Sequence, residues 1–403
     1  MAGMPVLPLA SLAAAAFALA TSELMMMGLL PELAESLDVS IPKAGLLVTG
    51  YAVGVVIAAP VMALITNGVA RKRTLLMLMA IFIVGNIVCA LAPNYTVLLA
   101  ARVFTAFCHA ALFGIAAVIA ADITPRDRQA MAVALVFGGV TVATILGVPL
   151  GTAIGQEFGW RAAFWMVVAM GGAAAVTVVI WLPSAIPVER VNLRQELATI
   201  GNRQVAMALV VSGFLWAGLF VVFTYVAPIL GEVAGASEEA IVWVFLIFGL
   251  GTMVGNFMGG RLADWKMLPS IVGMIAVVAV MLAVIAVVAH SIYLAVVALV
   301  IWGVFIFALI PALQIWVVRS ARDAPNVASI INQGSLHLGA AVGAWLGASA
   351  LYFGINYRHL PWVGEFLTLT ALAIAVVAMT AQYKHRKAAF AESPRSAAVA
   401  AGH

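Results

Sequence analysis

The chain has 403 residues, of which 65% are hydrophobic and only 9% are charged, and its mean hydropathy is +1.15. Soluble domains carry about 25% charged residues, so this composition excludes a soluble enzyme and a disordered chain and favours a surface that faces lipid. The net charge of +4 and the pI of 9.2 do not indicate a nucleic-acid partner, because the basic residues are scattered beside long apolar runs, as membrane topology requires.

Apolar stretches of about 20 residues, bounded by charges or by Pro and Gly clusters, predict membrane-spanning segments. Each is expected to be a helix, because lipid offers no partner for an open backbone donor and a membrane barrel would show short alternating strands instead. A cleaved signal peptide is the alternative for the first stretch, but no Lys or Arg precedes it and the apolar run continues to Pro31. The twelve predicted spans cover residues 9–31, 44–66, 74–92, 97–121, 130–155, 162–182, 204–230, 240–260, 269–289, 292–317, 327–354 and 362–383.

Lys and Arg are distributed unevenly between the loops. Of the 20 residues, sixteen lie in the loops and tail on the side of the chain ends, Lys43, Arg161 and Arg358 lie on the other side, and Arg102 lies in a span. Because positive loops stay in the cytoplasm, both termini are expected to be cytoplasmic. The opposite loops are acidic and contain Glu32, Glu35, Asp38, Glu157, Glu232, Glu238, Glu239 and Glu365.

The longest polar stretch between spans runs from Pro183 to Arg203 and separates six spans from six. A shift of 196 residues places Gly147 and Gly151 on Gly343 and Gly347, which indicates duplication. Two such repeats with a substrate site between them are typical of alternating-access carriers. We therefore expect an all-α integral membrane protein of two pseudo-symmetric six-helix bundles, at residues 1–182 and 204–383, with a cytoplasmic linker at 183–203 and a disordered tail at 384–403.

Four ionisable residues lie deep in predicted spans: Glu23, Arg102, His109 and His337. Each costs at least about 2.5–3.5 kcal/mol there unless it is paired or hydrated. Glu23 is either a proton-coupling carboxyl or a structural one that is bonded to a neighbouring helix. Arg102 cannot lose its charge and must find an acceptor, and it could be a clamp or a part of the coupling. The histidines could be functional or simply buried and hydrogen-bonded.

Aromatic, amide and methionine side chains of the spans could line a substrate cavity. For an aromatic or Met side chain, lipid or core contact is the commoner role, whereas an amide in a span needs a partner or water. The candidates for substrate binding are Met26, Trp216, Phe220, Phe223, Tyr225, Gln314, Asn332, Gln333 and His337.

No phosphate-binding loop, metal-ligand cluster or serine nucleophile elbow occurs in the sequence, so an enzyme, a metal site or a bound cofactor is not expected. Cys89 and Cys108 lie inside apolar runs and are interpreted as core residues. Gly147, Pro149 and Gly151 are different, because their ordered spacing in the fifth span exceeds what packing alone requires.

These features together resemble the major facilitator superfamily, and within it the bacterial twelve-span drug:proton antiporters with their sugar-efflux members. Arg102 matches the arginine of the fourth span in that family. The other matching segments are Glu23 with Gly28-Leu29-Leu30-Pro31, Gly147-Val148-Pro149-Leu150-Gly151, Gly159-Trp160-Arg161-Ala162-Ala163-Phe164, Phe223-Thr224-Tyr225-Val226-Ala227-Pro228 and Gly343-Ala344-Trp345-Leu346-Gly347.

The loop after the second span departs from the family pattern. Ala63 and Ala70 replace its two glycines and Asn67 its acidic residue, so only the basic end with Arg71 and Arg73 remains. The corresponding loop of the second half keeps Arg261 and Asp264. We expect these four charged residues to form the gating loops.

The resemblance implies export of small molecules, such as amphiphilic drugs, sugars or related metabolites, driven by a proton gradient. Glu23 would carry the proton, assisted by Arg102 and His109. The expected setting is a monomer in the lipid bilayer of a bacterial inner membrane, with the substrate and protons as partners. An uncoupled uniporter for a sugar or metabolite is the alternative. A receptor or scaffold is disfavoured, because the cytoplasmic loops are short.

Overall fold

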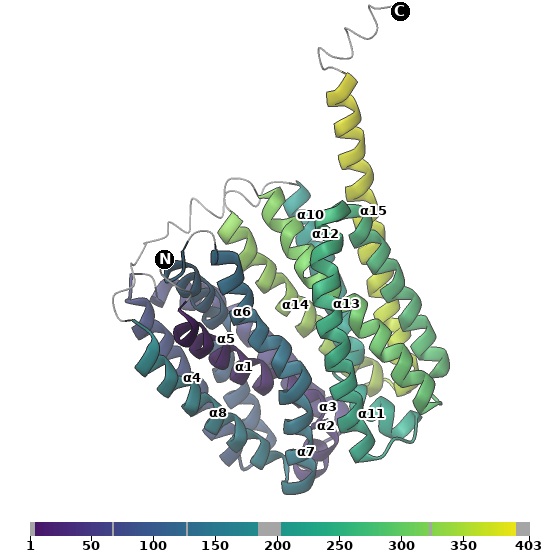
Figure 1. Cartoon of the computed structure of the whole chain (residues 1–403). Coiled ribbons are helices and arrows are strands. Elements are labelled where there is room, and N and C mark those ends of the chain that lie inside the picture. The colour runs from purple at the N-terminus through teal and green to yellow at the C-terminus, as the bar shows by residue number, and fades with distance from the viewer. Residues whose placement is uncertain (1–4, 67, 126–127, 184–202, 322–324, 392–403) are drawn as a thin grey trace, which may run out of the picture.

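The computed structural model describes residues 5–66, 68–125, 128–183, 203–321 and 325–391, and in these ranges the chain is helical with short connections (Figure 1). The first part contains α1 (Val6–Leu24), η1 (Met25–Met27), α2 (Leu30–Ser36), α3 (Ile41–Thr66), α4 (Arg71–Leu91), α5 (Tyr95–Asp122), α6 (Gln129–Val142), η3 (Ala143–Gly147), α7 (Val148–Phe158) and α8 (Trp160–Trp181). The second part contains α10 (Arg203–Phe223), α11 (Val226–Pro228), η5 (Ile229–Val233), α12 (Glu238–Val288), α13 (Ile292–Ser320), α14 (Pro325–Tyr352), η6 (Tyr357–His359) and α15 (Leu360–Ala391).

Among the described residues, 11 helical segments are long and apolar enough to cross a membrane. This confirms the expected all-helical membrane fold. The remaining predicted span, 327–354, corresponds to α14, a helix of 28 residues. It is less apolar than the others because it contains Asn332, Gln333 and His337.

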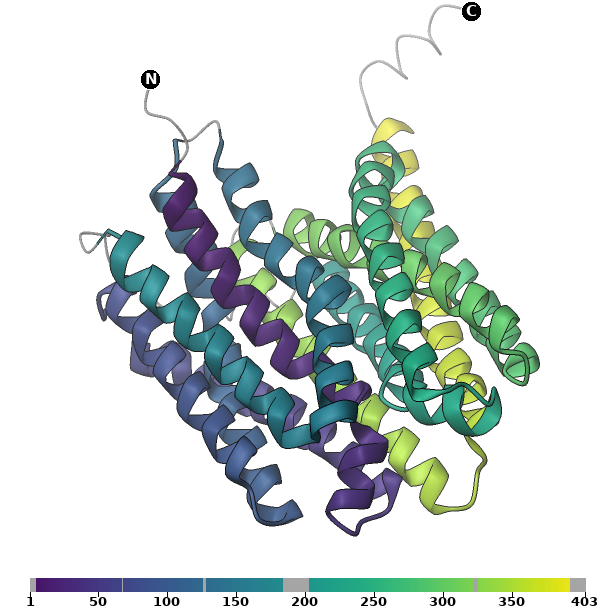
Figure 2. The same cartoon turned by 60° about the horizontal axis from the view of Figure 1, so that its bottom comes forward.

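The helices form two groups, α1–α8 (the N-terminal group) and α10–α15 (the C-terminal group). In Figure 2 the groups lie close together at one end and spread apart toward the end where both chain termini lie. We name the spread end the basic end, because α4 starts there with Arg71 and α10 with Arg203. The other end is the acidic end, where Glu32 and Glu238 lie in the first turns of α2 and α12. The pair α3 and α14 and the pair α12 and η3 connect the two groups.

Several spans are interrupted, and each interruption follows from the local sequence. The fifth span changes from α6 into the π-helical turn η3 before Pro149, since proline has no backbone N–H for the preceding helical turn. The two predicted spans 240–260 and 269–289 are joined in α12, where Lys266 has non-helical dihedral angles (φ −148°, ψ 85°).

Two expectations about the polar segments are modified. The helix α15 extends to Ala391, so the predicted tail does not begin at residue 384, and the part of it beyond 391 lies outside the described residues. Nearly all of the predicted linker at 183–203 also lies outside them. Glu365 was expected in an acidic loop, but it lies within α15.

Candidate transport site

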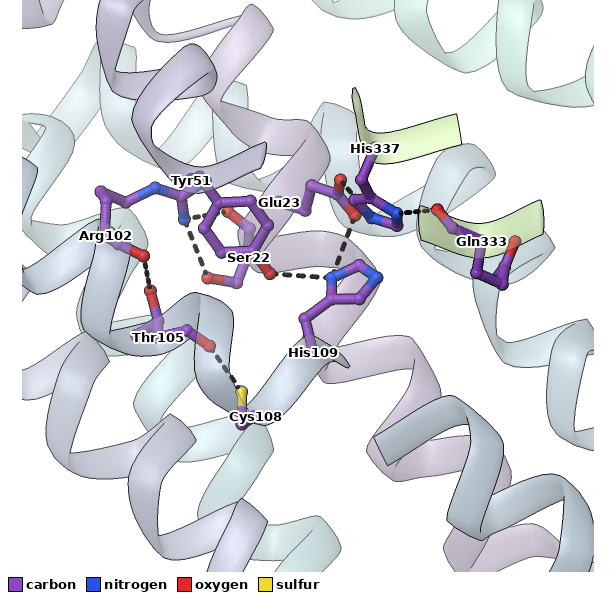
Figure 3. A network of polar contacts seen from close by, with 9 residues as sticks. All are labelled: Ser22, Glu23, Tyr51, Arg102, Thr105, Cys108, His109, Gln333 and His337. Carbon is purple, nitrogen blue, oxygen red and sulfur yellow. Dashed lines mark hydrogen bonds and ion pairs between the residues drawn. The ribbon is translucent and has the colours of Figure 1, made fainter. Parts of the chain in front are cut away.

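Glu23 lies where the two groups of helices meet, at the last turn of α1 before the helix tightens into η1. Its side chain is 15% exposed. Oε2 lies 3.5 Å from Nδ1 of His109 on α5, and Oε1 lies 3.8 Å from Nε2 of His337 on α14. Figure 3 shows the carboxylate between the two imidazole rings. We call these three side chains the Glu23 cluster.

The cluster joins residues that are far apart in the sequence. His109 belongs to the N-terminal group and His337 to the C-terminal group, and their ring centroids are 4.6 Å apart. His337 was predicted to bind substrate, whereas the structure places it directly against the predicted proton carrier. Gln333, one turn away on α14, accepts a hydrogen bond from Nδ1 of His337 with its backbone oxygen, at 2.8 Å.

Arg102 supports the cluster without contacting the Glu23 carboxylate in any described hydrogen bond or ion pair. It is 1% exposed, and its guanidinium donates a hydrogen bond of 2.9 Å to the carbonyl oxygen of Ser22. The guanidinium carbon lies 4.2 Å from the ring centroid of Tyr51. The arginine therefore holds the backbone beside Glu23 and stacks on a neighbouring aromatic ring, which favours the clamp that the sequence left open.

Tyr51, Ser22 and Asn86 complete this network, and none of them was predicted from the sequence. The Tyr51 hydroxyl lies 2.9 Å from Nδ1 of His109, and the Ser22 hydroxyl donates to Oδ1 of Asn86 at 2.8 Å. Asn86 is a fully buried amide in α4. The rule applied to Asn332, that an amide in a span needs a partner, would have found it.

The glycines of the fifth span lie against α1 on both sides of Glu23. A Cβ on Gly147 would come within 2.1 Å of Oγ1 of Thr21, and one on Gly151 within 2.9 Å of Cβ of Met25. Side chains at either position would displace the segment that carries Glu23. Both glycines thus allow the fifth span to approach closely the segment that carries Glu23.

The same span also contacts the C-terminal group. A Cβ on Gly249 of α12 would come within 2.6 Å of the carbonyl oxygen of Thr144 in η3. The widened π turn therefore packs its backbone directly on α12. Pro149 is buried in α7, and this helix continues after it without another interruption to Phe158.

Tyr225 occupies the contact between the two groups at the acidic end. It is 0% exposed and donates a hydrogen bond of 3.2 Å to the carbonyl oxygen of Ala344. An added Cβ on Gly45, from the N-terminal group, or on Gly347, from α14, would collide with its ring or hydroxyl. Tyr225 was predicted to bind substrate, but in this conformation it is packed in the closed acidic end.

A small cavity of about 190 Å³ lies beside this contact and is lined by both groups. Glu32 lies on its wall with three other carboxylates, Glu35, Glu232 and Glu238. Burial, reinforced by Glu238 and Glu35, raises the pKa of the Glu32 carboxyl to about 7, although its own backbone N–H and Gln156 donate to it. The closed acidic end therefore contains a carboxyl that titrates near neutral pH.

Most of the other predicted substrate residues are packed into the C-terminal group. Phe223 stacks on Phe248 with a centroid distance of 5.2 Å. Phe220 is buried in the same group, Trp216 is half-buried on α10, and Met26 is buried in η1 of the N-terminal group. Their role in this conformation is therefore packing.

The predicted amides form a pair. Nδ2 of Asn332 donates to Oε1 of Gln314 at 2.8 Å, which joins α14 to α13 one turn from the Glu23 cluster. Oδ1 of Asn332 is buried and has no hydrogen-bond partner among the described residues. This oxygen can accept a hydrogen bond from a ligand.

The predicted gating loops are only partly described. Arg71 forms an ion pair with Asp122, which links the start of α4 to the end of α5 within the N-terminal group. Arg73 and Arg261 are exposed at the basic end, and the side chain of Asp264 lies outside the described residues.

A metal ion would find three donor atoms within 4.8 Å of one another in the Glu23 cluster. The sequence contained no signal for this, because the three residues are separated by more than 80 positions each. In the structure one nitrogen of each histidine faces one oxygen of the Glu23 carboxylate.

A bundle of membrane-spanning helices with an ionisable cluster between its two groups defines a multi-pass carrier. Residues 12–344 match the Major Facilitator Superfamily. The chain belongs to this family, whose members transport small molecules and are not enzymes.

Three relatives cover nearly the whole chain. It is 36% identical to the "Inner membrane transport protein YdhP" of Escherichia coli (strain K12), over 93% of this chain and 96% of that protein. It is 31% identical to the "Putative transporter AraJ" of the same strain, over 94% and 96%. It is 32% identical to a "Chloramphenicol resistance protein" of Streptomyces lividans, over 92% and 95%.

Solved structures share the fold at low sequence identity. A bacterial homolog of the human lysosomal transporter Spinster, solved in an inward-facing and unoccupied conformation, superposes with a TM-score of 0.72 at 16% identity over 94% of this chain and 97% of that chain. The human organic anion transporter MFSD10 gives a TM-score of 0.69 at 15% identity, over 92% and 98%.

Proposed function

We propose that the protein exports small molecules in exchange for protons across a bacterial inner membrane. The observation that supports this proposal is the Glu23 carboxylate, which lies between the two groups of helices with one histidine from each. An intramembrane carboxylate is expensive to maintain and marks ion or proton pathways in transporters. Glu23 is placed where its protonation can influence how the groups contact each other.

The expected orientation is consistent with an outward direction of transport. Basic loops face the cytoplasm, so the basic end is the cytoplasmic end and the conformation described here is open toward the cytoplasm. A proton that binds Glu23 from the acidic end is released at the basic end, and a substrate binds in its place. Because proton and substrate affinities are reciprocally linked, the proton gradient drives the substrate outward.

The substrate class is proposed from the Asn332 amide. Its buried Oδ1 has no hydrogen-bond partner among the described residues and suits molecules that carry a hydroxyl or amide donor. The relative named for chloramphenicol resistance supports this choice, since chloramphenicol has both kinds of donor. Sugars and related metabolites are the second group to test.

The experiment is transport in proteoliposomes with an imposed pH gradient, with chloramphenicol and a panel of neutral sugars as probes. Wild-type protein should accumulate a probe against its gradient and move protons with it. Glu23→Gln preserves the size of the side chain but fixes it in a neutral form, so accumulation should be abolished while some binding remains. Glu157→Gln, at an exposed carboxylate of α7, is the matched control and should transport normally.

Two outcomes would change the conclusion. Gradient-driven accumulation by Glu23→Gln at the wild-type rate would show that Glu23 is structural. Equilibration of a probe without any proton movement would identify a uniporter for that compound.

A further inference from the structure

The position of one hydrogen on His337 can be deduced from its hydrogen bond. Nδ1 of His337 lies 2.8 Å from the carbonyl oxygen of Gln333. A carbonyl oxygen only accepts hydrogen bonds, so Nδ1 carries a hydrogen. In the neutral imidazole the other nitrogen, Nε2, is then an acceptor without a hydrogen.

This acceptor faces another acceptor. Nε2 of His337 lies 3.8 Å from Oε1 of Glu23. When Glu23 is ionised and His337 is neutral, two lone pairs face each other in a site that excludes most water, which is unfavourable. A water molecule about 2.8 Å from both atoms would hold them roughly 4.5 Å apart, which is farther than they are. One proton on either atom replaces this repulsion with an attraction, and a small approach from 3.8 Å then forms a charge-assisted or neutral hydrogen bond.

We propose that the exchanged proton is held jointly by Glu23 and His337 and that it joins the N-terminal group to the C-terminal group while the basic end is open. The inference rests on the proposed proton coupling and adds a second residue and a conformational role. With the proton present, the pair stabilises the arrangement in which it is formed. Without the proton, the two acceptors weaken that arrangement.

The effect of the shared proton on the basic end has the direction that export requires. A proton that enters from the acidic end must favour the opening of the basic end, where the substrate is loaded. Stabilisation of the basic-end-open arrangement by the shared proton supplies this step. Loss of the proton at the basic end then allows the loaded protein to return.

Among the residues that the structure describes, the other titratable and charged groups that face Glu23 come from the N-terminal group. His109 and Tyr51 contact the carboxylate side from α5 and α3, and the buried thiols of Cys89 and Cys108 lie behind them. The His109 ring also meets the His337 ring, with centroids 4.6 Å apart, but Nδ1 of His109 faces Tyr51 and Glu23, which belong to its own group. Arg102 keeps its charge and opposes a second proton, so that the pair takes up one.

The test measures conformation against pH without any substrate. Spin labels are attached at Met131→Cys and Trp265→Cys, exposed positions at the basic ends of α6 and α12, while the native cysteines are buried and do not react. Pulsed electron paramagnetic resonance in lipid nanodiscs gives the distance distribution from pH 5 to 8. The protein also carries Glu32→Gln, because Glu32 titrates in the same range at the acidic end.

In the labelled protein that carries Glu32→Gln, we expect a larger fraction of long label-to-label distances, which report an open basic end, as the pH falls. His337→Leu removes the acceptor and should abolish that response. His337→Gln and Glu23→Gln each provide an amide that can donate to the remaining partner at any pH, so both should keep the open distance throughout the range. His359→Gln, at an exposed histidine at the acidic end, should respond like the parent.

The proposal that Glu23 and His337 share a proton would be overturned if the Glu32→Gln protein showed no pH response. It would also be overturned if both His337 variants responded to pH as that protein does. The proposed function is judged separately by proton movement in proteoliposomes. Substrate-driven proton flux together with an unchanged response in the His337 variants would leave the exporter intact and assign the proton to Glu23 alone.

Discussion

Gly45 of α3 lies so close to Tyr225 of the other group that an added Cβ would come within 2.1 Å of the Tyr225 hydroxyl oxygen. The hydroxyl is held by Ala344 and the ring by Gly347, so it has no space into which to move. The closed acidic end therefore depends on the absence of a side chain at Gly45.

Gly45→Ala should open the acidic end. Overpacking of a buried contact costs about 1–3 kcal/mol, and this cost is relieved when the groups separate there. Spin labels at Glu157→Cys and Glu239→Cys, both exposed at the acidic end, would report a larger fraction of long distances. Gly172→Ala on α8, where a Cβ meets nothing within 4 Å, should leave the distribution unchanged.

The glycines beside α1 should affect coupling more than folding. Gly147→Ala and Gly151→Ala push against Thr21 and Met25 and so displace Glu23, and we expect a loss of proton-driven accumulation with little loss of inserted protein. Gly138→Ala, in the same span but in open space, is the control. Equal transport by all three variants would mean that the spacing serves only packing.

The acidic end should loosen as the pH rises. The pKa of Glu32 is about 7 in the closed state and returns toward its usual value near 4.3 when the end opens. Protonated Glu32 therefore stabilises the closed acidic end fully below about pH 4.3. This stabilisation is lost between about pH 4.3 and 7 and does not change further at higher pH. Acidic-end distances should lengthen over this interval in wild type, and Glu32→Gln should remove this part of the change. Loss of the response in Glu157→Gln instead would place the titration elsewhere.

Arg102→Lys tests whether Arg102 acts through its positive charge or through its contacts with Tyr51 and Ser22. Lysine keeps the positive charge, but it has no planar group to stack on Tyr51 while donating to Ser22. Loss of these contacts should reduce stability by about 1–3 kcal/mol, measured as a lower thermal midpoint in detergent. A variant as stable as wild type would show that Arg102 acts through its charge alone.

The spans were predictable because membrane helices must satisfy their own backbone hydrogen bonds, and this leaves a plain apolar signature. The positions at which the spans are interrupted could not be predicted. The π turn before Pro149 and the one-residue turn at Lys266 depend on how neighbouring spans pack, as does the extension of α15 to Ala391.

The site was predictable in its parts and not in its arrangement. Glu23, His109 and His337 stood out because ionisable residues are rare in spans, but only the fold shows that they touch. Tyr51 gave no signal, because a tyrosine in a span is commonly at an interface or in the core. For the aromatic candidates, the sequence could not distinguish burial in the core from the lining of a cavity.

The turn at Lys266 has a mechanical consequence. It joins the segment Glu238–Ala263, which packs on the N-terminal group, to Trp265–Val288 with almost no slack, and Ser270 donates a hydrogen bond of 2.9 Å back to the carbonyl oxygen of Leu262. Any tilt of the inner segment during the transport cycle must therefore drag the outer one through the surrounding lipid.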